Sequence, residues 1–254
     1  MFFIFQVYVN FQKTDKRKYN VSQTLMSEIN LSCPPNSTLL IADWTTVIQY
    51  YYYRIVENFR PDLVVLYYDL KFTNYKILKN VYPGFYKDIK PEYDRFIQLL
   101  GNAHPLEIYD TGSTFDNAEL MYSFLAVISK MKERCEKTNT PFMCDPKAYL
   151  FFAKQDTTSS NFIMSGCFVS TIETNIGKEF VNLDYSWMTS PIILTEPSAT
   201  DKLVDLEAAL DFSKYYYNLT GDTIRLKKAE SAYSRVKEIQ KKMKQNMPFL
   251  FRKK

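Results

Sequence analysis

The chain has 254 residues and a mild formal net charge of +4, so charge alone predicts no partner class. It contains 6 glycines and neither G-x-G-x-x-G nor G-x-x-x-x-G-K, which argues against a glycine-rich phosphate-binding loop. One histidine and four widely spaced cysteines without a C-x-x-C pair argue against a zinc site, so we expect no metal and no cofactor.

The amino-terminal run is open to two interpretations. Residues 2–11 are apolar and aromatic, but they are too few to span a bilayer, which needs about 20 residues. Charged residues follow at once over 12–18. The run is either a buried first strand or the end of a membrane helix that begins outside this sequence.

A strand, a helix and a second strand are predicted between residues 38 and 67. Residues 38–42 and 63–67 are short and apolar, which is typical of strands covered on both faces. Asp43 or Thr45 can cap the helix between them, and Pro61 ends it. Together these elements predict a βαβ unit.

The helix of this unit carries apolar residues at helical spacing. That spacing predicts one buried face, formed by Ile48, Tyr51, Tyr52, Ile55 and Phe59. The same geometry places Tyr50 and Tyr53 toward solvent.

Further helices and strands alternate along the middle of the chain. Helices are predicted over 73–82, 91–100, 116–137 and 146–154, and strands over 106–109, 141–144 and 162–174. Gly166 marks a bend in the last strand region. The pattern predicts an α/β fold with a small Rossmann-like, mostly parallel sheet and flanking helices.

The last part of the chain is predicted to be an αα-hairpin of helices over 201–219 and 222–246. Basic residues around its end are either a solvated face or a contact with anionic lipid. We therefore expect three segments: a membrane-helix stub with a charged juxtamembrane segment over 1–18, an α/β domain over 19–200, and a helical hairpin cap with a basic tail over 201–254.

Several short pieces occur in the order found in one protein family. They are Asn-Phe-Gln-Lys-Thr-Asp at 10–15, Pro-Asn-Ser-Thr-Leu-Leu-Ile at 35–41, residues 52–57, Arg-Pro-Asp-Leu-Val-Val at 60–65, Pro-Phe-Met-Cys at 141–144 and Ser-Gly-Cys-Phe-Val at 165–169. Together they resemble the segment that follows the last membrane helix in protein O-mannosyltransferase-like membrane glycosyltransferases, once classed as a bacterial domain of unknown function. The likeness touches most of residues 8–175, and Arg60-Pro61-Asp62 is its most specific piece.

The resemblance implies an architecture. Members of that family resemble polytopic enzymes that use a lipid-linked sugar donor, with acidic catalytic residues between early membrane helices, a region this chain does not contain. The resemblance implies a membrane-associated, extracytoplasmic (periplasmic) accessory domain that is not catalytic by itself. The implied partners are the membrane-embedded part of the parent protein, an acceptor protein or glycan and the membrane surface. Nucleic acid is not expected, because no recognised nucleic-acid-binding motif accompanies the basic residues.

The chain departs from its suggested relatives at one cluster. Many bacterial relatives carry Asp-Asn-Asp-Thr where the first strand meets its helix. The corresponding stretch here is Asp43-Trp44-Thr45-Thr46, which retains one carboxylate.

Candidate ligand residues lie at the carboxyl ends of predicted strands, where open α/β sheets bind ligands. Trp44 could stack on a sugar ring while Asp43 accepts hydroxyl hydrogens beside Thr45; alternatively, Asp43 caps the helix and Trp44 packs. Asp69 and Asp110 end two further predicted strands. If the strands are neighbours, three carboxylates line one rim.

Two rival functions stay open. The chain could be a self-contained carbohydrate-active enzyme that uses the aspartate rim for acid–base chemistry. It could instead be a protein-interaction module that binds partners between its last two helices. Arg60 and Asp62, on either side of Pro61, are interpreted as a tie from the helix end to a neighbour and a turn closure, or else as a charged partner surface.

Overall fold

The computed structural model describes residues 21–68, 70, 75–102, 118–149, 163–165, 168–171 and 197–246. The chain divides into two compact units: one is Cys33–Ile176, and the other combines Met1–Ser32 with Gly177–Lys254. The predicted membrane stub, the predicted strand over 106–109 and the candidates Asp69, Asp110 and Gly166 lie outside the described residues. The three predicted segments therefore stay predictions.

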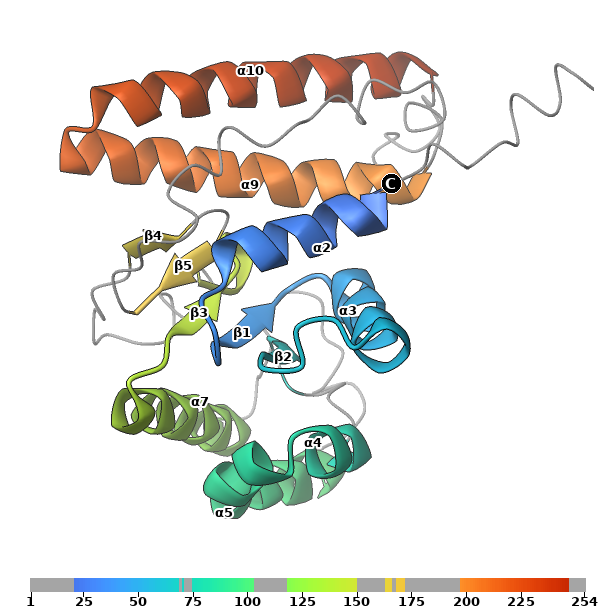
Figure 1. The fold of residues 1–254 in the computed structure, drawn as a ribbon, viewed down its shortest axis with the longest axis vertical. Helices are drawn as coiled ribbons and strands as arrows, with labels where there is room; N and C mark the ends of the chain where they lie inside the picture. Colours follow the sequence, from blue (N-terminus) through green and yellow to red (C-terminus); the bar gives the residue numbers. More distant parts are fainter. Residues whose placement is uncertain are drawn as a thin grey trace, which may run out of the picture. The chain divides into compact units, whose positions relative to one another are not determined.

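The unit Cys33–Ile176 is built around a five-stranded sheet in its described part, with strand order β2-β1-β3-β5-β4 (Figure 1). The strands are β1 Thr38–Ile41, β2 Val64–Tyr67, β3 Phe142–Cys144, β4 Ile163–Ser165 and β5 Phe168–Ser170. Strand β1 pairs in parallel with β2 and β3, whereas β5 is antiparallel to β3 and β4. Four of the five strands therefore run in one direction, which confirms the predicted α/β class with a mostly parallel sheet.

Four helices of this unit are described: α3 Trp44–Glu57, α4 Tyr75–Val81, α5 Pro83–Asn102 and α7 Ala118–Thr138. Helices α5 and α7 pack against each other, and α3 and α7 contact the strands (Figure 1). The predicted start of the second helix at residue 91 is wrong, because α5 begins at Pro83 and contains Pro91. Proline is favoured at a first helical position, where no N–H is needed. Pro91 costs the helix one backbone hydrogen bond, and the burial of the apolar face of α5 stabilises the helix by more than that loss.

The predicted buried face of α3 is wrong. Tyr50 is completely buried, whereas Tyr52 is 57% exposed and Ile55 71% exposed. The buried residues of α3 are Thr46, Val47 and Tyr50. Four consecutive tyrosines make the helix amphiphilic on every side, so apolar spacing does not single out one face. Tyr50 is the tyrosine that becomes buried, and its hydroxyl donates to the carbonyl oxygens of Arg60 and Leu63 beyond the end of the helix.

The core of this unit is strongly aromatic. Its largest fully buried side chains include Tyr50, Tyr93, Phe96, Phe124 and Phe142. Three cysteines are also buried and unbridged, namely Cys33, Cys135 and Cys144. Burial raises the pKa of each of these thiols, so they stay protonated and pack as small apolar groups.

The other unit contains α2 Val21–Ser32, α9 Pro197–Thr220 and α10 Thr223–Asn246. Helices α9 and α10 pack along each other in opposite directions, since Glu207 accepts hydrogen bonds from Lys237 and Gln240. Gly221 supplies the left-handed backbone, at φ 72°, in the short connection between them. None of the described helices is both long enough and apolar enough to cross a membrane.

Candidate functional site

The carboxyl ends of the parallel strands carry the first group of candidate residues. Asp43 follows β1 in an extended conformation and caps α3. Its carboxylate accepts hydrogen bonds from the backbone N–H groups of Thr45 and Thr46, at 3.2 and 2.9 Å, and from both threonine hydroxyls. These bonds satisfy the donors that every helix leaves free at its start. Thr45 therefore touches Asp43, as expected from their proximity, and the group acts as a helix cap.

A second carboxylate at this edge was missed by the sequence reasoning. Asp145 follows β3, and its carboxylate accepts from the backbone N–H groups of Ala42 and Ala148. Its own N–H donates to Leu40 O at 3.0 Å. The acid thus ties the end of β1 to the end of β3 and caps the helical turn at 146–149. The available signal was an aspartate between a buried strand and Pro146, which is a helix-start pattern.

Aromatic side chains lie beside these two carboxylates. Trp44 is 37% exposed and meets the ring of Tyr67 edge to face, with 5.5 Å between the ring centroids. Tyr67, at the end of β2, also meets Tyr68 at 5.1 Å. The carboxyl edge of β1, β2 and β3 therefore combines two acids bound to backbone N–H groups with a partly exposed indole. We call this group, Asp43, Trp44, Tyr67 and Asp145, the carboxyl-edge cluster.

The two carboxylates of the carboxyl-edge cluster are held by backbone hydrogen bonds. All four carboxylate oxygens of Asp43 and Asp145 accept at least one hydrogen bond from backbone N–H. These bonds fix the orientation of both carboxylates. The two acids therefore hold strand ends and helix starts in place.

A network around Arg60 joins the other motif residues. Arg60 forms a two-point ion pair with Asp62, with Nε–Oδ1 and Nη2–Oδ2 distances of 2.9 Å each. Nη2 also donates to the carbonyl oxygens of Cys33 and Pro34, and Asp62 accepts from the N–H of Asn36. The hydrogen bonds from Arg60 hold the pKa of Asp62 below its usual range. The guanidinium therefore ties the segment before β1 to the turn before β2.

A cluster centred on Tyr50 continues this network into the core. The Tyr50 hydroxyl donates to Arg60 O at 2.8 Å, and Arg54 Nη1 donates to Leu63 O at 3.0 Å. The Arg54 guanidinium also lies 4.7 Å from the centre of the Tyr82 ring. Burial raises the pKa of Tyr50, so the hydroxyl keeps its proton and acts as a donor. Tyr50 and Arg54 thus satisfy the carbonyl oxygens of Arg60 and Leu63, which lie in the connection between α3 and β2.

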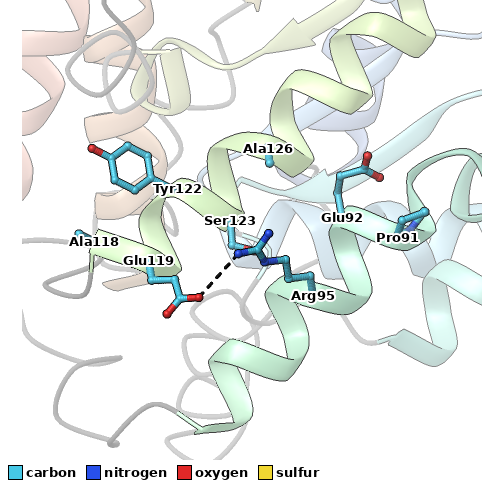
Figure 2. A pocket seen from close by; sticks show the side chains of 8 residues that line it. All are labelled: Pro91, Glu92, Arg95, Ala118, Glu119, Tyr122, Ser123 and Ala126. Atoms are coloured by element: carbon cyan, nitrogen blue, oxygen red, sulfur yellow. Dashed lines mark ion pairs between the residues drawn. The ribbon is translucent and has the colours of Figure 1, made fainter.

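A hollow of about 570 Å³ lies between α5 and α7 (Figure 2). Its polar lining consists of Glu92 and Arg95 from α5 and of Glu119, Tyr122 and Ser123 from α7. Arg95 and Glu119 form an ion pair across it at 3.7 Å. Sequence reasoning did not predict this hollow, because none of its residues forms a motif.

Replacing Asp43 with alanine tests the capping role. We expect Asp43→Ala to lower the free energy of unfolding by about 1–2 kcal/mol, because the first turn of α3 loses its acceptor. Asp43→Asn should recover most of that loss, since an amide oxygen also caps. Urea unfolding followed by circular dichroism measures both, and equal stability of Asp43→Ala and the wild type would contradict the role.

No protein family, no curated protein and no solved structure matches this chain. Among the described residues, no group of three or more histidine, cysteine, aspartate or glutamate side chains is placed to hold a metal ion.

Proposed function

We propose that this chain is an extracytoplasmic accessory domain of a membrane glycosyltransferase, and that it presents or binds an acceptor instead of transferring sugar. The observation that carries the proposal is the carboxyl-edge cluster. Its two acids are engaged by backbone N–H groups, while the indole of Trp44 stays partly exposed beside them. An exposed indole is suited to stacking on the apolar face of a sugar ring.

The structure supports the proposal at the residues that carry the family resemblance. Arg60 and Asp62 join the turn before β2 to residues 33–36, which precede β1. Pieces separated by more than 20 residues in the sequence thus form one hydrogen-bonded unit. Arg60 and Asp62 therefore have one structural role in common with residues 33–36, which is a reason for these pieces to occur together in one family.

An exposed apolar face on α3 supports docking to a larger partner. Ile48, Tyr52, Ile55 and Val56 follow helical spacing and are all exposed. Large side chains grouped in this way mark protein or membrane contacts more often than isolated ones do. Within the proposal, this face meets the membrane-embedded part of the parent protein or the membrane surface at the periplasmic side.

The finer fold assignments belong to the same proposal. We class the sheet as Rossmann-like because its parallel strands β1 and β2 are joined by helix α3 in a βαβ unit. Sheets of this class bind ligands at the carboxyl ends of their strands. Helices α9 and α10 serve as a helical hairpin cap. Leu203, Leu210, Val236 and Ile239 of these helices are buried, whereas other large apolar residues of the same helices are exposed, namely Val204, Tyr215, Leu219 and Ile224.

The test compares sugar transfer with sugar binding. The purified chain is incubated with polyprenyl-phosphate mannose and a serine- and threonine-rich acceptor peptide, and separately titrated with a mannosylated peptide by NMR. We expect no transfer, and binding that weakens at least fivefold in Trp44→Ala. Tyr215→Ala, which removes an exposed aromatic ring from α9, should leave binding unchanged.

Two outcomes would count against the proposal. Turnover of the lipid-linked donor by the isolated chain would show that it is an enzyme, and loss of that turnover in Asp43→Asn would favour the aspartate-rim alternative. Identical binding by the wild type and Trp44→Ala would show that the carboxyl-edge cluster is not the acceptor site.

A further inference from the structure

Helix α10 carries more positive charge than the chain as a whole. Its 24 residues include eight lysines and arginines and two glutamates, which leaves six positive charges. The remainder of the chain has 24 basic and 26 acidic residues, so it carries two net negative charges. Helix α9, which pairs with α10 in the hairpin, has four acidic and two basic residues. The excess positive charge is therefore concentrated on α10.

Three of the basic residues share one exposed side of α10. Lys228, Arg235 and Lys242 recur at intervals of seven residues, which is close to two helical turns, so they line up along the helix. All three are exposed and lie outside the buried face of α10. At a rise of about 1.5 Å per residue, this basic row is about 21 Å long. A straight row of that length suits a flat, extended partner.

The acids of the hairpin do not neutralise this charge. Lys227 and Lys228 form no ion pair with any residue that the structure describes. Glu238 is paired with Lys242 at 2.9 Å and also interacts with Arg235. One carboxylate is thus shared by two cations, and positive charge remains for an external anionic partner.

Apolar side chains are exposed at the connection between α9 and α10, at the left in Figure 1. Leu219, near the end of α9, is 66% exposed, and Ile224, in the first turn of α10, is 72% exposed. Ile224 precedes Lys228 by four residues, so it lies on the same side of α10 as the basic row. Large apolar side chains beside lysines are typical of surfaces that enter the headgroup region of a membrane.

The two features together indicate which polyanion fits. A basic row attracts nucleic acid and anionic lipid alike. Phosphates of nucleic acid gain little from exposed leucine or isoleucine, whereas a bilayer removes such side chains from water. Clusters of about four to eight lysines and arginines on a helix are also typical of contacts with anionic lipid. The combination of charge and apolar end therefore favours a membrane.

We propose that α10 and the apolar end of the α9–α10 hairpin form a binding surface for a membrane rich in anionic phospholipid. Lys228, Arg235 and Lys242 contact the lipid phosphates, while Leu219 and Ile224 enter the headgroup layer. This inference does not rest on the proposed function, because it needs neither a sugar donor nor an acceptor. It also involves a surface other than the exposed face of α3.

The experiment measures co-sedimentation of the whole chain with vesicles of phosphatidylcholine, with or without about one third phosphatidylglycerol. We expect at least tenfold stronger binding to the anionic vesicles, and weaker binding as salt screens the attraction. The double variant Lys228→Gln/Arg235→Gln should bind at least fivefold more weakly. Leu219→Ser/Ile224→Ser should bind severalfold more weakly although its charge is unchanged.

The matched control is Lys79→Gln/Lys87→Gln, which removes the same charge from exposed positions on α4 and α5 and should change binding less than twofold. Equal binding to neutral and anionic vesicles, or full binding by both α10 and hairpin-end variants, would overturn the proposal. So would displacement of the chain from anionic vesicles by a short DNA duplex at lower phosphate concentration, which would indicate nucleic acid.

A further variant distinguishes this inference from the proposed function. Ile48→Ser/Ile55→Ser alters the exposed face of α3 and should leave vesicle binding unchanged. Loss of binding in this variant, with full binding in Leu219→Ser/Ile224→Ser, would assign the membrane contact to α3. That result would support docking through α3 and contradict the surface proposed on α10.

Discussion

Tyr50→Ala is expected to lower the free energy of unfolding by about 3–5 kcal/mol, the largest effect of any substitution considered for α3. The side chain is completely buried, so its removal leaves a cavity among closely packed aromatic rings. It also removes the hydroxyl that donates to the carbonyl oxygens of Arg60 and Leu63. Loss of packing and loss of a buried donor act in the same direction.

Tyr52→Ala is the matched control for this prediction. Tyr52 belongs to the same helix, but 57% of it is exposed, so the substitution should change stability by less than about 0.5 kcal/mol. Tyr50→Phe keeps the ring and should cost about 1 kcal/mol, since Arg54 still donates to both carbonyls. Urea midpoints of the three variants give the ranking. A larger loss of stability in Tyr52→Ala than in Tyr50→Ala would instead support the buried face of α3 that the sequence predicted.

The second large effect is expected at Arg60. Arg60→Ala should cost about 2–4 kcal/mol, because it breaks the two-point pair with Asp62 and the bonds to the carbonyl oxygens of Cys33 and Pro34. Arg60→Lys should recover only part of the loss, since an ammonium cannot reproduce the planar, two-point geometry. Lys90→Ala, which removes an exposed ion pair with Asp94, should cost less than about 1 kcal/mol.

The same pair predicts how stability depends on pH. Hydrogen bonds from Arg60 lower the pKa of Asp62 in the folded state. Its contribution to stability is therefore fully present above the unfolded value, near pH 4, and is lost as the pH falls through the lowered folded value. The stability difference between wild type and Arg60→Ala should shrink in that range. A difference that stays constant from pH 6 to pH 2.5 would contradict the role assigned to the pair.

Several parts of the fold followed from local sequence. Short apolar runs identified β1, β2 and β3. Pro61 was predicted to end the helix after β1, but α3 ends earlier, at Glu57, where Asn58 takes the left-handed conformation of a C-cap. Apolar residues recur at helical spacing along the last predicted helix, and these residues, Ala229, Ala232, Val236, Ile239 and Met243, form the buried face of α10. The strands and the last helix each had one dominant local signal: a run too short and apolar for a helix, or a single unambiguous stripe.

The candidate site was only partly predictable. Asp43 and Trp44 were placed at a strand end, and the structure puts them there, with Asp43 as the cap of α3. Asp145 was missed, because its importance depends on β3 being the parallel neighbour of β1. That pairing joins residues about 100 positions apart, and no local pattern reports it.

The sequence by itself determined approximately where most of the described strands and helices begin and end, because hydrogen bonding and side-chain spacing within one element are local properties. The tertiary structure alone decided which side of α3 is buried, which acids meet at the carboxyl edge, and that Glu92 and Ser123 share a hollow. Those outcomes depend on which distant surfaces pack together. Several residues of similar apolar character could be buried at each position, and local sequence does not distinguish them. Which of them is buried depends on the shape of each side chain and on the backbone carbonyl and amide groups that it can hydrogen-bond.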